Sequence, residues 1–252
     1  MSPARRTLAD FLPTLQNRDE FFDKLAREQH PGRYLLSLCL LLTLLLFFYG
    51  AIMGSNTGIL QALSAGVKLP VLFFLSLLIC FPAFYIVQYI LGSTMKISQM
   101  AATILSGFVL TAAIMVSFTP IVMFFVLTGG NYHFMQLLHV AVFAVAGLFG
   151  MKAVLDALRF SCEQKGIYPK TGVVVFRFWV VILAFVGIQL AWNLRPFLAN
   201  KEEPYALFRH YEGNFYTAVI YSISRLTDTE PPPPRPPRGP VWLGPDSTAA
   251  GQ

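Results

Sequence analysis

The stretch from Tyr34 to Met151 contains no Asp or Glu, and its only Lys or Arg residues are Lys68 and Lys96. Charged residues make up 13% of the 252-residue chain and hydrophobic residues 55%. An average soluble domain has about 25% charged residues, so this chain lacks the charges needed to coat a water-exposed globule of its size. The gap therefore predicts an integral membrane protein that crosses the bilayer several times.

Five apolar runs reach the length that a membrane-crossing helix needs, about 20 residues. They predict spans at residues 34–53, 69–91, 100–127, 134–155 and 173–194. We therefore expect an all-α fold, a polytopic membrane helix bundle of about five transmembrane helices. Pro120 predicts a kink in the third run and Pro82 a kink in the second, and Ser117 and Thr119 stand where they could satisfy the backbone groups freed by Pro120.

The chain divides into four predicted segments. A cytoplasmic amphipathic segment at 1–33 precedes the five-span domain at 34–195, and an amphipathic or interfacial helix at 196–228 precedes a proline-rich tail at 229–252. The tail contains PPPPRPP, and so many prolines favour an extended, disordered conformation without a core.

The two amphipathic segments carry apolar side chains at helical spacing. The first stripe is Phe21, Phe22 and Leu25, and the second includes Phe208, Tyr211 and Phe215. Both stripes are candidate contacts for lipid or for a protein partner. Residues 203–226 are too polar for a sixth span, so we expect a helix that lies at the membrane interface or docks on a partner.

The fifth run ends in GIQLAWNLRPF, an order that suits a helix leaving a bilayer. Trp prefers the membrane interface and Arg can extend to the headgroups, so Trp192 and Arg195 are candidate lipid contacts. Gln189 and Asn193 are four residues apart and share a helix face. With His139, the one imidazole predicted at depth, they form a candidate polar face turned toward the bundle.

The Lys and Arg residues of the short connections predict the orientation of the chain. One side holds eleven of them, before the first run and in the second-to-third and fourth-to-fifth connections, whereas the other side holds only Lys68. The positive-inside rule then places the N-terminus in the cytoplasm and the C-terminus outside, in a bilayer such as the bacterial inner membrane.

Small residues at four-residue spacing predict close helix packing. Gly107 and Thr111 lie in the third run, and Ala146 and Gly150 lie in the fourth. Such faces let helices approach closely in lipid, either within the monomer or between copies.

The sequence lacks the patterns that carry chemistry. It contains no HExxH, GxSxG or P-loop motif, and its three cysteines show no metal or redox spacing. The runs hold no carboxylate that could pair with His139 in a proton relay. We therefore predict no catalytic residue, no cofactor and no metal site. The basic residues flank apolar runs, which indicates lipid headgroups rather than nucleic acid.

The body at residues 34–195 resembles the bacterial Yip1-type membrane proteins. The features that carry the resemblance are the amphipathic N-terminal segment, the five apolar runs, the KLP sequence at Lys68–Pro70 and the SFTP sequence at Ser117–Pro120. The resemblance implies a five-span protein that acts in membrane organisation, trafficking or complex assembly rather than in catalysis, and it assigns no functional residue.

Three functions remain open from the sequence. The leading hypothesis is a non-enzymatic integral membrane scaffold or accessory subunit, which binds lipid and protein partners, or itself, through its spans and amphipathic ends. The first alternative is a small channel or uncoupled permease. Its path would be lined by some of Gln88, Ser106, Thr111, His139 and Gln189. The second alternative is a membrane-bound lipid-modifying enzyme with a polar pocket near His133 or Arg195.

Overall fold

The structure, a computed structural model, describes residues 31–90, 96–129, 131–164, 169–198 and 215–227. Every regular element in these ranges is a helix, which confirms the predicted all-α fold. Five helical segments are long and apolar enough to cross a membrane. The protein is therefore a multi-pass membrane protein in contact with lipid. The stripe of Phe21, Phe22 and Leu25 and the proline-rich tail lie outside the described residues.

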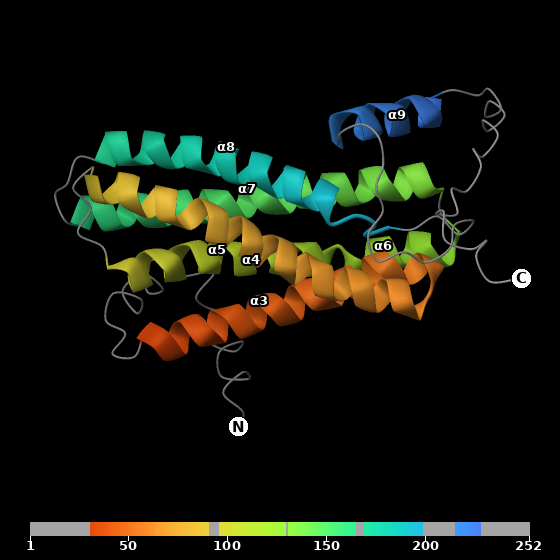
Figure 1. Cartoon of the computed structure of the whole chain (residues 1–252), viewed down its shortest axis with the longest axis horizontal. Coiled ribbons are helices and arrows are strands. Elements are labelled where there is room, and N and C mark those ends of the chain that lie inside the picture. Colours follow the sequence, from red (N-terminus) through yellow and green to blue (C-terminus); the bar gives the residue numbers. More distant parts are fainter. Residues whose placement is uncertain (1–30, 91–95, 130, 165–168, 199–214, 228–252) are drawn as a thin grey trace, which may run out of the picture.

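The five candidate spans run back and forth along one axis (Figure 1). In chain order the elements are α3 (Pro31–Gly54), the short 3-10 helix η1 (Ser55–Thr57), α4 (Ile59–Ile90), α5 (Ile97–Ser117), α6 (Thr119–Leu127), α7 (Tyr132–Gln164), α8 (Pro169–Asn193) and α9 (Phe215–Thr227). We call the end of the bundle that holds η1, the α6–α7 turn and the residues after α8 the η1 end; it lies on the right in Figure 1.

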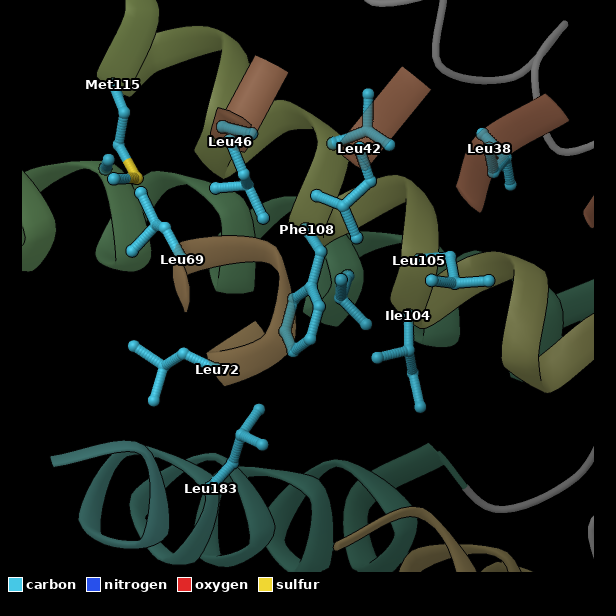
Figure 2. Packing of buried hydrophobic residues seen from close by; sticks show 14 of the residues in the cluster. Leu38, Leu42, Leu46, Leu69, Leu72, Ile104, Leu105, Phe108, Met115 and Leu183 are labelled. Carbon is cyan, nitrogen blue, oxygen red and sulfur yellow. The ribbon is translucent and has the colours of Figure 1, made fainter. Parts of the chain in front are cut away.

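The spans close into a ring around an apolar interior. Helix α3 packs against α4 and α5, α5 against α7, α7 against α8, and α8 against α4. Figure 2 shows how the interior is filled: leucines of α3, such as Leu42 and Leu46, point toward Leu69 and Leu72 of α4 and toward Phe108 of α5. Because lipid replaces water outside such a bundle, its specificity comes from this side-chain packing rather than from hydrophobic collapse alone.

The third span is interrupted close to its proline. Helix α5 ends at Ser117 and α6 begins at Thr119, so the break falls at Phe118, before Pro120. The break lies where the sequence predicts a kink, because proline lacks the N–H that would continue the helix. The hydroxyl of Ser117 donates to the carbonyl of Ala113 (2.9 Å). The Thr119 hydroxyl is buried and has no hydrogen-bond partner within the described residues.

Helix α4 begins ten residues earlier than predicted, at Ile59 instead of residue 69, and continues unbroken through Pro70 and Pro82. The predicted run began at residue 69, directly after Lys68. Instead, Lys68 lies inside the helix with only 6% of its surface exposed, and its ammonium donates to the carbonyl of Pro196 (3.3 Å). The prediction that Lys68 belongs to the connection between two helices was therefore wrong.

Two helix pairs approach closely through small residues. A methyl group on Gly150 of α7 would collide with the Thr111 side chain and would lie 2.7 Å from the carbonyl oxygen of Gly107. This confirms the packing predicted from the four-residue spacing and places it within the monomer. Likewise, a methyl group on Gly50 of α3 would lie 2.6 Å from the Ala65 carbonyl oxygen of α4.

Candidate functional site

A deeply buried polar pair joins α3 to α7. The hydroxyl of Tyr49 and Nδ1 of His139 are hydrogen-bonded at 2.9 Å, and their rings meet edge-on with centroids 5.7 Å apart. Tyr49 is 1% exposed and His139 is 5% exposed. Since lipid offers no hydrogen-bond partner, each side chain gives the other the partner that burial in a bilayer requires.

A chain of aromatic ring contacts continues from this pair. Phe143 of α7 lies edge-on to Tyr49, with ring centroids 6.1 Å apart. Phe73 of α4 lies 6.4 Å from the Phe143 ring and meets Phe108 of α5 edge-on at 5.4 Å. We call Tyr49, Phe73, Phe108, Phe143 and His139 the central aromatic cluster. It draws on α3, α4, α5 and α7, and it fills the space between these spans with side chains.

A tryptophan fixes α8 to α4. The indole N–H of Trp179 donates to the carbonyl of Cys80 (2.9 Å), and its ring lies 4.6 Å from the Phe84 ring and 5.4 Å from the Phe176 ring. Trp179 was not among the site residues predicted from the sequence. A usable signal was present, because an indole N–H within a span needs an acceptor and a span carbonyl is the nearest one.

A second polar group lies where α8 ends. The amide of Gln61 donates to the carbonyls of Pro196 (3.0 Å) and Phe197 (3.1 Å), and Lys68 donates to the same Pro196 carbonyl. We call these four residues the η1-end cluster. The carbonyls at and after a helix C-terminus have no partner within the helix. The two side chains of α4 supply donors that lipid lacks.

The residues predicted as one polar face do not form one hydrogen-bonded group in the described part of the chain. His139 belongs to the central aromatic cluster on α7. Gln189 and Asn193 lie on α8, Gln189 half-buried and Asn193 exposed. The spacing of Gln189 and Asn193 on one helix was readable from the sequence, whereas the distance to His139 depends on how α7 and α8 pack.

Trp192 and Arg195, the predicted lipid contacts, lie together at the end of α8. The guanidinium of Arg195 lies over the Trp192 ring, and its Nε donates to the Trp192 carbonyl (3.4 Å). Both side chains are half-buried. They adjoin Pro196 in the chain, so the end of α8 and the η1-end cluster form one continuous region.

Three hydroxyl groups of α5 bond to their own helix. Thr103 donates to the Gln99 carbonyl, Ser106 to the Thr103 carbonyl and Thr111 to the Gly107 carbonyl. All three are buried. Groups satisfied in this way pack against neighbouring spans as small residues do.

Helix α9 meets α7 through a third polar contact. The Ser222 hydroxyl lies 3.2 Å from Nδ1 of His133 and donates to Oε1 of Gln136 (3.2 Å). Phe215, a predicted contact residue, is the first residue of α9 and is half-buried. The other two, Phe208 and Tyr211, lie outside the described residues.

Ligand chemistry is sparse in this arrangement. Among the described residues, no three His, Cys, Asp or Glu side chains gather where they could hold a metal ion. Three of the polar contacts described above join one helix to another: Tyr49 with His139, Trp179 with Cys80, and Ser222 with Gln136. Their chemistry is that of helix–helix association in a bilayer.

No family model matches the sequence, and neither a curated protein nor a solved structure matches it. The resemblance to Yip1-type proteins therefore stays a prediction, and any function must be inferred from the bundle itself.

Proposed function

We propose that the protein is a non-enzymatic integral membrane scaffold or accessory subunit that anchors or organises a membrane complex. The observation that carries the proposal is the filled interior of the ring, where the central aromatic cluster occupies the space between four spans. A bundle of this kind offers a rigid outer face rather than a path for a solute.

The outer face of α8 supports this proposal. In the most apolar segment of each candidate span, α8 has the smallest buried share, 17%, against 28% or more in each of the other four. Phe178, Val181 and Phe185 of α8 are all more than half exposed. This face gives a partner span, or a second copy of the chain, a broad apolar surface within the bilayer.

Affinity purification in a mild detergent tests the proposal. We expect partners to be recovered in a fixed ratio, and we expect a Phe178→Ala, Phe185→Ala double variant to lose them. A Leu148→Ala, Phe149→Ala variant, which alters two exposed residues of α7, is the matched control. A monomer that catalyses substrate-dependent flux in liposomes would contradict the proposal.

We further propose that the N-terminus faces the cytoplasm. With Lys68 inside α4, the connection at the η1 end between α3 and α4 carries no Lys or Arg. The predicted charge asymmetry therefore becomes larger. In a cysteine-free background, an impermeant thiol reagent should label Asn131→Cys in intact cells and Lys96→Cys only after permeabilisation. The reverse pattern would overturn this orientation.

A small channel is the second candidate, and one observation favours it. Several buried polar atoms, among them Nε2 of His139, Oγ1 of Thr119 and Oε1 of Gln61, have no hydrogen-bond partner among the described residues. Water is a usual partner for such groups. If the bundle conducts, a Phe73→Ala, Phe108→Ala variant should raise solute flux in proteoliposomes. A scaffold should show no flux with or without these rings.

A further inference from the structure

Helix α9 lies beside the first turns of α7 and follows the general direction of the spans (Figure 1). Its Ser222 stands at the level of His133 and Gln136, and the Tyr221 ring meets the His133 ring edge-on at 5.6 Å. The candidate span of α7 begins at Tyr132. The part of α9 around Ser222 therefore lies against a membrane-spanning segment.

The polarity of α9 is the reverse of that of a helix on a water-exposed surface. Ser222, which faces α7, is 1% exposed. The opposite face carries Tyr216, Ile220 and Ile223 at helical spacing, with between 45% and 66% of the surface of each exposed, and the exposed Thr217 lies beside them. A helix in water turns its polar side outward, whereas a helix in lipid turns its apolar side outward.

The length and the ends of α9 indicate how far it reaches. Thirteen residues at a rise of about 1.5 Å each give about 20 Å, which is short of the hydrocarbon thickness of about 30 Å. Phe215 precedes Ser222 by seven residues, or about 10 Å of helix. In Figure 1 the N-terminal end of α9 lies near the end of α8, which α9 also contacts, and the C-terminal end of α9 lies near the start of α7.

The single charged residue of α9 lies at its C-terminal end. Arg225 is in the last turn, its Nε donates to the Tyr221 hydroxyl (2.8 Å), and its guanidinium lies over the Tyr221 ring. An arginine at the end of an inserted helix can extend its charge to the headgroups while its stem stays in the apolar layer. The hydroxyl of Ser224 donates to the Tyr221 carbonyl of its own helix (2.9 Å), so this group is satisfied without water.

We propose that α9 is a membrane-inserted helix that does not cross the bilayer, with its outer face of Tyr216, Ile220 and Ile223 against lipid acyl chains. This differs from the helix at the interface plane, or on a partner, that the sequence predicts. Lipid is the occupant that fits, because α7, on which α9 packs, exposes similar apolar side chains, such as Leu148 and Phe149. The inserted α9 would extend that apolar outer surface.

Spin labels in liposomes test this proposal on the full-length chain. Single cysteines are placed at Ile220, Ile223 and Ser222 after the native cysteines are replaced. Collision rates are then measured with oxygen, which concentrates in lipid, and with a water-soluble nickel chelate. Leu148→Cys is the lipid-facing reference, and Asn131→Cys, in the exposed α6–α7 turn, is the aqueous reference.

We expect the labels at 220 and 223 to match the label at 148, with a high collision rate with oxygen and a low collision rate with the nickel chelate. The label at 222 should show low collision rates with both reagents. Nickel accessibility at 220 and 223 similar to that at 131 would overturn the proposal and place this face in water. Low rates with both probes at 220 and 223 would also overturn it, because the face would then be covered by a protein partner or a second copy.

Discussion

The hydroxyl of Tyr49 and Nδ1 of His139 lie 2.9 Å apart, and this hydrogen bond joins residues that are 90 positions apart in the chain. Tyr49 belongs to α3 and His139 to α7, and both helices pack against α5. The bond therefore ties together two spans that share a neighbour, and it does so inside the ring.

Replacing Tyr49 by Phe removes the hydroxyl group and leaves Nδ1 of His139 without this hydrogen-bond partner. We expect a loss of about 0.5–2 kcal/mol in the free energy of unfolding, the range for hydrogen bonds between membrane helices. Tyr89→Phe is the matched control, since Tyr89 is 69% exposed. The check is thermal unfolding in detergent, and equal midpoints for the two variants would show that the bond contributes nothing.

Replacing Gly150 by Val separates α5 from α7. The added side chain would meet Thr111 and the Gly107 carbonyl, and overpacking of this kind costs about 1–3 kcal/mol or more. Gly147→Val changes the same helix at a position where a Cβ meets no atom within 4 Å. We expect Gly150→Val to lower the yield of folded protein in size-exclusion chromatography and Gly147→Val to leave it unchanged. Matching profiles would rule out the close crossing.

The sequence was sufficient for the architecture because lipid imposes one strong rule: a spanning helix must be long and apolar. That rule found all five spans, whereas the break near Pro120 was predicted from the proline itself. It misplaced the start of α4, because Lys68 looks like a boundary until its partner is known. The partner is the Pro196 carbonyl, 128 residues away, which no local pattern reveals.

The candidate site was only partly predictable for the same reason. The burial of His139 in the bundle was readable from its isolated position in an apolar run, whereas its pairing with Tyr49 depends on how α3 and α7 meet around α5. The packing at Gly107 was predictable from the spacing. The Gly50–Gly54 pair in GAIMG shows the same spacing on α3, although it was not among the predicted packing faces.

Replacing Trp179 by Phe removes the indole donor that bonds the Cys80 carbonyl. The lost hydrogen bond and the smaller ring should together cost about 1–3 kcal/mol of stability. Phe178→Leu is the control, because Phe178 is the neighbouring residue and is 71% exposed. Thermal unfolding should show a lower midpoint for Trp179→Phe alone. If both variants unfold like the wild type, α8 is not fixed through this tryptophan.

Replacing Lys68 by Met should release the residues that follow α8. Lys68 and Gln61 both donate to the Pro196 carbonyl, and a bond of about 1 kcal/mol is worth roughly a fivefold change in the population of the opened state. The measurement is the alkylation rate of a cysteine placed at the half-buried Leu198 in a background free of native cysteines. We expect the rate to rise several-fold in Lys68→Met and more in Gln61→Leu, whose side chain makes two of the bonds.

Lys96→Met, which alters an exposed lysine, should leave the rate unchanged. A cysteine at 198 that reacts at one rate in all of these proteins would mean that the η1-end cluster does not hold this segment in place.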